Sequence, residues 1–298
     1  MTPIDGQPIL TAAEMRAAEE RAIAAGSSVE QLMERAGAGI AEAVHRLAAG
    51  SPVLVLCGPG NNGGDGYVAA RLLKANGVAV RAAAAGDPTS KAAVAVRRQY
   101  DAPVDVLATA NDSPVVVDAL FGTGLSRALD APMQGALVRL VGGARLSLAV
   151  DLPSGVASDD GALLGDVPGF DLTLALGALK PAHVLQPAAS QCGTVRLIDI
   201  GVAAATSRCR VLARPDLAPP PVDAHKYSRG FVAVIGGEMT GASELAAEAA
   251  MRAGAGYVLL FGDQADSGPP HALVRRKWAP DALRKALDGK KAAAIVIG

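Results

Sequence analysis

Strand-like apolar runs alternate with helical stretches along the middle of the chain. The strand-like runs lie at 53–57, 78–84, 115–120, 147–151, 171–177 and 194–200, and the helical stretches at 64–75, 90–99 and 132–141. Strands that are apolar almost throughout, with helices between them, are typical of a mostly parallel sheet covered on both faces. The pattern therefore predicts an α/β fold, and periodicity alone leaves the strand order open.

Two helices are predicted before the first strand. Thr11 and Glu14 have the spacing of a capping box, in which each side chain bonds a free N–H group at the helix start. The helix that they begin is expected to end at Gly26. The same pattern opens the stretch 28–50, which predicts a second helix.

A second α/β unit is predicted after a proline-rich stretch. Residues 213–223 include four prolines and have no apolar periodicity, which is typical of an extended linker. A new order of strand, glycine turn, helix and strand follows, at 231–237, 242–254, 257–261 and 292–297. We therefore expect domains at 1–212 and 225–298 with a linker at 213–224. The second domain is short for an open parallel sheet and looks incomplete.

Composition narrows the class of protein. The 298 residues are 50% hydrophobic but only 3% aromatic, so the core is expected to consist of Ala, Val and Leu. The formal net charge of −1 argues against a nucleic-acid partner. The three cysteines form no C-x-x-C pair, and neither a signal peptide nor an apolar run of about 18 residues is present. We expect a cytoplasmic protein without a membrane segment.

The most distinctive motif is GPGNNGGDG at 58–66, between an apolar strand and a helix. Such a turn presents backbone N–H groups to a phosphate. It fits G-x-G-x-x-G, but the second strand, 78–85, lacks the acid that would hold a ribose, and no Gly-Lys-Ser/Thr follows. A tight turn that serves only helix packing is the alternative. The side-chain oxygens of Asn61, Asn62 and Asp65 favour a ligand.

Two further strand ends carry polar side chains. Asp118 lies near the end of one buried strand, before Gly122-Thr-Gly124, and Asp151 ends the next, before Ser154. Ligands of open α/β sheets bind at the carboxyl ends of strands. Hard oxygen ligands suit a hard cation, and a carboxylate beyond those on the cation suits acid–base catalysis. The alternative for Asp118 is a purely structural role as the cap of a neighbouring turn.

Other polar residues have simpler interpretations. We expect His45 to be a surface or packing histidine, Cys57 a core residue, and Glu19 to Arg21 a solvated helix face. Lys180 and His183 follow the strand at 171–177 and can approach the same sheet edge.

The motifs GPGNNGGDG (58–66), DALFGTG (118–124) and DLPSG (151–155), with GALKP (177–181), resemble the NAD(P)H-hydrate epimerase family. The run HKYSRGFVAVIGG (225–237) resembles the start of an ADP-dependent NAD(P)H-hydrate dehydratase. The resemblance implies a Rossmann-like three-layer αβα sandwich, followed by an incomplete ribokinase-like α/β domain. It also implies nicotinamide nucleotide repair, in which the R and S forms of NADH or NADPH hydrated at C6 are interconverted.

The resemblance assigns roles by matching position. Asp151 would be the catalytic residue and would reach the damaged ring, and a potassium ion would be held by Asn62, Asp118 and Ser154. The substrate-binding residues would be Asn61, Asn62, Gly63, Gly64, Asp65, Gly122, Thr123, Gly124, Leu125, Ser126, Arg127, Ala128, Asp151 and Ala242. A homodimer through the first domain is also implied.

An intact dehydratase domain would use ADP or ATP. The family's phosphate-binding turn follows the strand that ends this chain at Gly298, so we expect no dehydratase activity from the chain alone. Two alternatives are a non-catalytic nucleotide-binding or dimerisation module of the same fold, and an NAD-dependent oxidoreductase.

Overall fold

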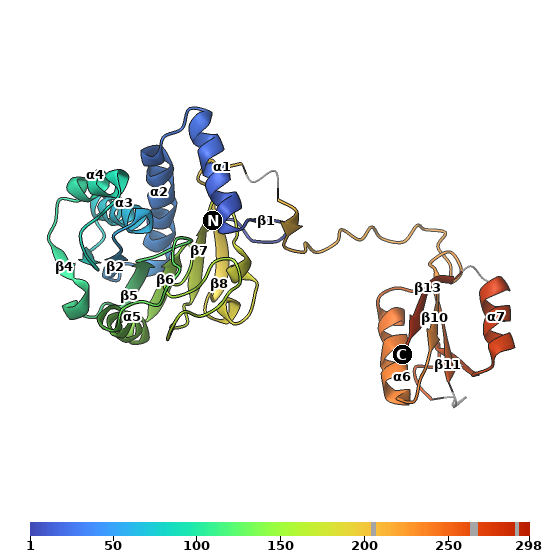
Figure 1. Ribbon diagram of the computed structural model, residues 1–298. Helices are drawn as coiled ribbons and strands as arrows, with labels where there is room; N and C mark the ends of the chain where they lie inside the picture. The colour runs from blue at the N-terminus through green and yellow to red at the C-terminus, as the bar shows by residue number, and fades with distance from the viewer. Residues whose placement is uncertain (204–206, 263–267, 290–291) are drawn as a thin grey trace. The chain divides into compact units, whose positions relative to one another are not determined.

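The chain folds into two compact units, Met1–Arg214 and Pro215–Gly298. The structure is a computed structural model that describes residues 1–203, 207–262, 268–289 and 292–298. The boundary between the units falls within a stretch, 212–221, that has neither helix nor strand and whose side chains are exposed. Each unit is described by itself below (Figure 1).

The first unit is built on a seven-stranded sheet in which every neighbouring pair is parallel. The strand order is β4-β3-β2-β5-β6-β7-β8, so the direction of winding reverses between β2 and β5. The predicted α/β fold with a mostly parallel sheet is confirmed. The strands are β2 (Val53–Cys57), β3 (Val80–Ala84), β4 (Val104–Val106), β5 (Val115–Ala119), β6 (Leu146–Val150), β7 (Leu172–Leu176) and β8 (Thr194–Ile198).

Helices cover both faces of this sheet (Figure 1). Alternate residues of β2 belong to two different cores: Val53, Val55 and Cys57 to one, Leu54 and Leu56 to the other. The first core includes residues of α1 (Ala12–Ala24), α2 (Val29–Ala48), α3 (Asn61–Ala75) and α4 (Lys91–Gln99), and the second those of α5 (Ala131–Gly143). Successive side chains of a strand point to opposite faces of the sheet, so both faces of β2 pack against helices. This arrangement is the expected αβα sandwich.

Both predicted capping boxes are present. The Thr11 hydroxyl accepts the N–H of Glu14, whose carboxylate accepts the N–H of Thr11, and Ser28 and Gln31 exchange the same two bonds. These bonds satisfy helix-start N–H groups that have no partner within the helix. They explain why both helices begin where the sequence indicates.

Three short strands of the first unit, β1 (Pro8–Ile9), β4 and β9 (Cys209–Arg210), escaped prediction. β4 is only three residues long and is followed by the 3₁₀ turn η1 (Leu107–Thr109), so its apolar pattern is too short to recognise. The strands β1 and β9 pair with each other, antiparallel, from opposite ends of the unit.

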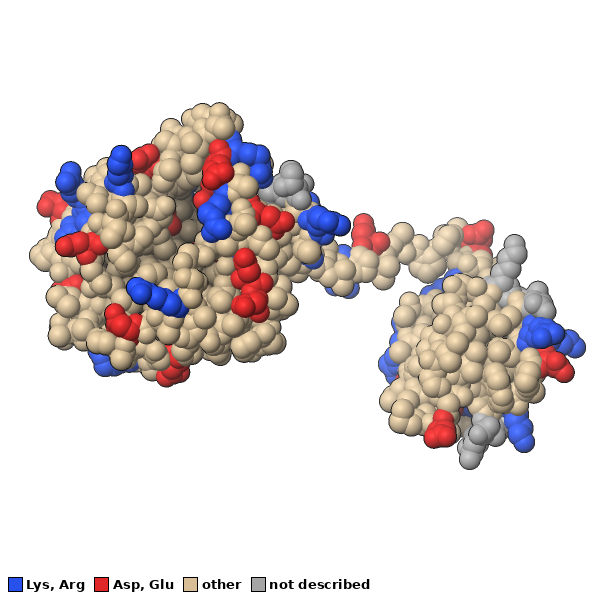
Figure 2. All heavy atoms as spheres, viewed as in Figure 1, with Lys and Arg blue, Asp and Glu red and all other residues tan. Residues whose placement is uncertain are grey.

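The second unit has a four-stranded parallel sheet of order β12-β11-β10-β13. The predicted elements correspond to β10 (Phe231–Ile235), α6 (Thr240–Arg252), β11 (Tyr257–Gly262) and β13 (Ala292–Ile297), whereas β12 (Val274–Lys277) and α7 (Pro280–Gly289) were missed. Within the described ranges of the whole chain, no helix combines the length and the apolar character that crossing a bilayer requires. Figure 2 shows both signs of charge interspersed on the viewed face of the first unit.

Candidate functional site

The glycine segment after β2 is shorter than predicted, because α3 already begins at Asn61. A Cβ atom on Gly58 would lie 1.8 Å from the Leu120 carbonyl oxygen, and one on Gly63 would lie 1.8 Å from the Gly58 carbonyl oxygen. These glycines are therefore required for close packing, as expected of a tight turn that serves helix packing. A ligand can still bind at this segment, because α3 has no side-chain cap and the N–H groups of its first turn remain available.

The two asparagines at the start of α3 face different neighbours. The Asn61 carboxamide oxygen accepts a hydrogen bond of 2.6 Å from the Ser90 hydroxyl, at the start of α4. The Asn62 amide nitrogen donates to the Val150 carbonyl at 3.4 Å, which directs this side chain toward the end of β6. Asn62 thus belongs to the side of the segment that faces Asp151, and Asn61 to the opposite side.

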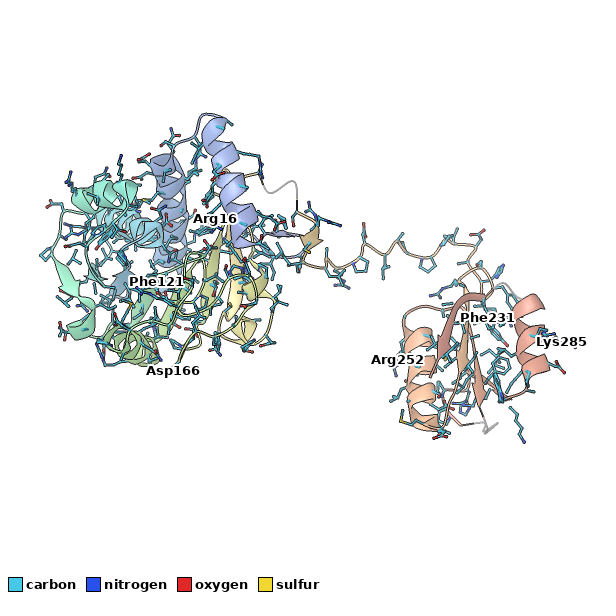
Figure 3. The ribbon with its side chains drawn as sticks, in the orientation of Figure 1. Arg16, Phe121, Asp166, Phe231, Arg252 and Lys285 are labelled. Atoms are coloured by element: carbon cyan, nitrogen blue, oxygen red, sulfur yellow. The ribbon has the colours of Figure 1, made fainter. Side chains whose placement is uncertain are left out.

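Asp118 and Ser154 are in direct contact. The Asp118 carboxylate, 0% exposed, accepts hydrogen bonds from the Ser154 N–H at 2.9 Å, the Ser154 hydroxyl at 2.8 Å and the Leu120 N–H at 3.0 Å. The N–H of Phe121, labelled in Figure 3, donates to the Ser154 hydroxyl oxygen at 2.9 Å. Burial raises the pKa of Asp118 to about 6, although these bonds oppose the shift. All three partners of the carboxylate are neutral groups.

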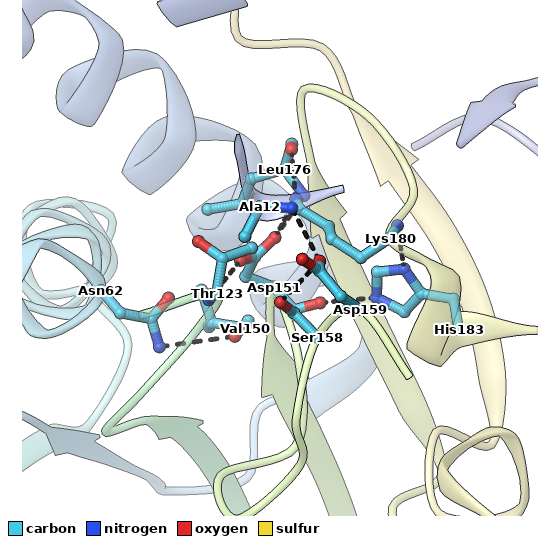
Figure 4. Close-up of polar contacts among 10 residues, drawn as sticks. All are labelled: Ala12, Asn62, Thr123, Val150, Asp151, Ser158, Asp159, Leu176, Lys180 and His183. Atoms are coloured by element: carbon cyan, nitrogen blue, oxygen red, sulfur yellow. Dashed lines mark hydrogen bonds and ion pairs between the residues drawn. The ribbon is translucent and has the colours of Figure 1, made fainter. Parts of the chain in front are cut away.

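Asp151 lies at the centre of the site (Figure 4), in a left-handed backbone conformation with φ of 65°. Its carboxylate accepts hydrogen bonds from the N–H groups of Thr123 and Leu176, both at 3.3 Å, and forms an ion pair with Lys180. A Cβ atom on Gly122 would lie 2.7 Å from the same carboxylate. The loops after β5, β6 and β7 therefore converge on one acidic side chain.

Lys180 is the main residue whose importance the sequence only suggested. Its side chain is 1% exposed, and its ammonium group donates to Asp151 and, at 2.9 Å, to the Leu176 carbonyl. Burial of an unpaired lysine ammonium group costs free energy of folding, so Lys180 requires Asp151 as its partner. The GALKP motif was the available signal.

His183 orients the backbone around this pair. Its Nδ1 accepts the Lys180 N–H at 2.8 Å, so its Nε2, 2.6 Å from the Asp151 carbonyl oxygen, carries the proton and donates. Burial and the nearby Lys180 ammonium group lower the pKa of His183 to about 4. The ring is therefore neutral near pH 7 and links residues 151 and 180.

Two further carboxylates lie near Lys180. Asp65, which was predicted to bind a ligand in the glycine motif, lies within α3 and is 8% exposed; burial, followed by the charges of Asp151 and Glu19, raises its pKa well above the usual range. Glu19 was expected on a solvated face, and this was wrong: it is half-buried, and burial raises its pKa. The pattern of one helix could not reveal the burial of Glu19, because the groups near it, Lys180 and Asp151, lie far away in the sequence.

The remaining predicted residues are more peripheral. Gly122 and Thr123 contact Asp151, whereas Gly124, Ser126, Arg127 and Ala128 are exposed and Leu125 is half-buried. Gly64 packs against Met33, with 2.6 Å between the Met33 sulfur and a Cβ on the glycine. Ala242 is exposed in the first turn of α6, in the other unit.

The donor set after β2, β5 and β6 fits a hard cation in its chemistry. Asn62, Asp118 and Ser154 supply an amide oxygen, a carboxylate and a hydroxyl, and the Phe121 carbonyl lies 3.3 Å from the Ser154 hydroxyl. Asp118 in addition is a buried carboxylate without a cationic partner among the described residues. A bound cation would supply that charge.

Residues 29–182 match the model of a family described as YjeF-related protein N-terminus. This segment is more than half of the chain and includes every residue from Asn61 to Lys180 discussed above. The chain belongs to this family.

The curated relatives that match this chain are of two kinds: some are named for a single activity and others are named as bifunctional. The NAD(P)H-hydrate epimerase of Clavibacter sepedonicus is 38% identical over 213 residues, covering 64% of this chain and 89% of that protein. The bifunctional NAD(P)H-hydrate repair enzyme Nnr of Coxiella burnetii is 34% identical, covering 96% of this chain and 63% of that protein, and the one of Thermofilum pendens is 33% identical, covering 92% and 55%. The chain therefore spans between half and two thirds of these longer relatives.

A solved crystal structure of the yeast protein ynu0 has the same fold. It superposes with a TM-score of 0.55 at 24% identity and covers 63% of this chain and 86% of the yeast chain. This likeness agrees with a Rossmann-like architecture for the first unit.

Proposed function

We propose that Met1–Arg214 is an NAD(P)H-hydrate epimerase, an isomerase that interconverts the R and S forms of NADH or NADPH hydrated at C6. Family membership and the names of the relatives support the reaction class. The structural observation that carries the proposal is the Asp151 carboxylate, which sits beside Gly122 at the convergence of three strand-end loops.

Asp151 is the group that moves the proton. Its carboxylate takes the proton of the C6 hydroxyl as the C6–N1 bond breaks, and delivers it to N1, which leaves an aldehyde at C6 and an N–H enamine. On closure N1 attacks the other face of the aldehyde, and the carboxylate takes the N1 proton and returns it to the oxygen. Lys180 supplies the positive charge that a buried carboxylate needs, and Leu176 and Thr123 fix its two oxygens. Lys180 and His183 are positioning residues, since they act through Asp151.

The dinucleotide phosphates are proposed to lie between two sets of donors. The uncapped N-terminus of α3, at Asn61 to Gly63, offers N–H groups and the positive end of a helix dipole. The loop 122–128, which is exposed at Gly124 and at 126–128, offers further N–H groups and the Arg127 guanidinium.

Asn62, Asp118 and Ser154 would hold a potassium ion. The ion would supply positive charge beside the buried Asp118 carboxylate and near the substrate phosphates. The burial of Asp118 without a cationic partner in the described part of the chain supports this assignment.

The test replaces Asp151 with Asn, which keeps the side-chain volume and removes the base. We expect epimer exchange, followed by chromatography of the R and S forms, to fall at least ~100-fold while NADH binding changes little. The exposed Asp166 provides the control: Asp166→Asn is expected to retain full activity. Undiminished exchange in the Asp151→Asn protein would contradict the proposal.

The same assay separates the alternatives. Binding without exchange in the unsubstituted protein would indicate a non-catalytic module, and a change in redox state would indicate an oxidoreductase. The cytoplasmic location, the homodimer, the substrate contact of Ala242 and the inactivity of the second unit with ADP or ATP remain predictions. Consumption of the S form with ADP by the purified chain would contradict the last of these.

A further inference from the structure

A cavity of about 520 Å³ lies at the carboxyl ends of β3 and β4, apart from the residues around Asp151. It is walled by the segment after β3, by the end of α4 and by the start of α5. The lining residues are Tyr67, Ala84, Ala85, Gly86, Asp87, Pro88, Arg97, Val104, Asp105, Val106, Leu107, Ala108, Asp130, Pro132 and Met133.

This cavity and the proposed reaction site lie on opposite sides of β2. In the strand order, β3 and β4 precede β2, and β5, β6 and β7 follow it. All these strands are parallel, so both places are at the same edge of the sheet. The glycine segment after β2 therefore lies between them.

The cavity wall is bonded directly to the glycine segment. The backbone N–H and the hydroxyl of Thr89 both donate to the Pro59 carbonyl, at 2.8 and 3.1 Å, and the Ser90 hydroxyl donates to Asn61 at 2.6 Å. A phosphate group on the start of α3 would thus have the reaction site on one side and this cavity on the other.

Most polar groups of the cavity are already engaged. Asp105 pairs with Arg81 at 2.8 Å, and Asp130 accepts the Met133 N–H at 2.9 Å as the cap of α5. Arg97 lies over the Tyr67 ring, 5.5 Å from its centroid. Asp87 differs: it is exposed, and within the described part of the chain its carboxylate has no hydrogen bond or ion pair.

We propose that this cavity binds the adenosine end of the dinucleotide and that Asp87 accepts hydrogen bonds from its ribose hydroxyls. The proposal rests on the proposed function and extends it to substrate choice. In doubly wound folds an acid after the second strand binds the ribose in this way. The sequence pattern missed it because Asp87 lies beyond the strand, after Gly86, whose φ of 146° turns the chain.

The same arrangement favours the NADH-derived over the NADPH-derived hydrate. Three carboxylates line the cavity: Asp105 is paired with Arg81 and Asp130 caps α5, whereas Asp87 has no such partner in the described part of the chain. A 2′-phosphate would displace the hydroxyl that Asp87 binds and would place like charges close together. Ala84, Val106 and Met133 provide an apolar wall for the base.

The test uses stable probes, so that binding is measured independently of turnover. Calorimetric titration of NADH and NADPH is expected to show about tenfold tighter binding of NADH by the unsubstituted protein. Asp87→Asn is expected to weaken NADH binding about tenfold and to remove most of the difference between the two. Asp101→Asn is the matched control, because Asp101 is exposed before β4, at the opposite edge of the sheet.

A second variant tests the cavity itself. Ala108→Trp places an indole in the cavity and is expected to weaken ADP-ribose binding about tenfold or more. An unchanged NADH-to-NADPH ratio in Asp87→Asn, unchanged ADP-ribose binding in Ala108→Trp, or binding of neither dinucleotide by the unsubstituted protein would each overturn the proposal. Failure of the proposed function appears differently, as absence of epimer exchange in the unsubstituted protein.

Discussion

The two units each contain a strand, a pair of glycines and a helix, but among the described residues the cluster of buried charged groups lies around the turn of the first unit. After β2, Gly58 and Gly63 allow backbone to approach backbone; after β10, Gly236 packs on Ser243, with 2.8 Å between a Cβ on the glycine and the serine oxygen. Close packing explains the glycines in both. The turn provides N–H groups, and the chemistry comes from the neighbouring strand ends.

Buried polar side chains make the difference. Around the first turn they include Asp65, Asp118, Asp151, Ser154, Lys180 and His183. In the described part of Pro215–Gly298 they include Ser243 and the Arg275 side chain, which is 7% exposed and is paired with Glu244. Substitutions matched between the units test whether this contrast accounts for activity and stability.

The largest effect is expected for Lys180→Met, which leaves the Asp151 carboxylate buried without its cation. Epimerase activity should fall ~100-fold or more, and the free energy of unfolding by about 3–5 kcal/mol. Lys285→Met, on the exposed face of α7, should change neither. An active and stable Lys180→Met protein would show that the ion pair has no positioning role.

The next effect concerns pH. The pKa of His183 is about 4 in the folded protein against 6.5 for a free histidine, so the unfolded chain binds the proton more tightly. Stability contributed by the neutral ring is complete above pH 6.5 and is lost as pH falls through about 4, on the order of 3 kcal/mol. His183→Gln should flatten this slope in denaturant titrations, and the variant of the exposed His225, His225→Gln, should retain it. Equal slopes in all three proteins would refute the role of His183.

A pair of glycine variants compares the packing of the two turns. Gly63→Ala forces a methyl group against the Gly58 carbonyl and should lower the free energy of unfolding by about 1–3 kcal/mol. Gly241→Ala, in α6, meets open space and should raise it by about 0.5–1 kcal/mol. Urea denaturation measures both, and a stable Gly63→Ala protein would contradict the close approach.

The smallest expected difference is between two buried serines. Ser154→Ala removes bonds of 2.8 and 2.9 Å and leaves Asp118 short of a donor, at a cost of about 1–3 kcal/mol. Ser243→Ala removes a single bond of 3.4 Å and should cost about 0.5 kcal/mol. If potassium activates exchange, Ser154→Ala should also raise the concentration required for half-activation. Equal losses of unfolding free energy in the two variants would mean that the Ser154 hydroxyl stabilises the protein no more than the Ser243 hydroxyl.

Most of the helices and strands could be predicted from the sequence. Apolar runs such as 53–57 and capping boxes such as that at Thr11 are local signals, and each of them marks an element that the structure contains. The start of α3 at Asn61 was not predictable, because glycine and asparagine disfavour helix, and the close packing of Gly63 on Gly58 and of Gly64 on Met33 is visible only in the structure.

The candidate site was predictable in its parts and less so in its geometry. Asp118, Asp151 and Ser154 are recognisable as strand-end side chains, but the bond between Asp118 and Ser154 depends on β5 lying beside β6. The strand order also brings Lys180 onto Asp151, and the position of α1 brings Glu19 near both. Such contacts between distant segments have no signature in local periodicity.

The backbone of Asp151 is tied to two separate segments. Its N–H donates to the Leu174 carbonyl at 2.8 Å, its carbonyl accepts from His183, and its carboxylate accepts from the Leu176 N–H. Breaking one of these contacts strains the others, so the amide hydrogens of Asp151, Leu176 and Lys180 should exchange with deuterium as one cooperative group. Equal exchange rates at these three amides would show that the site opens as one unit with the ends of β6 and β7.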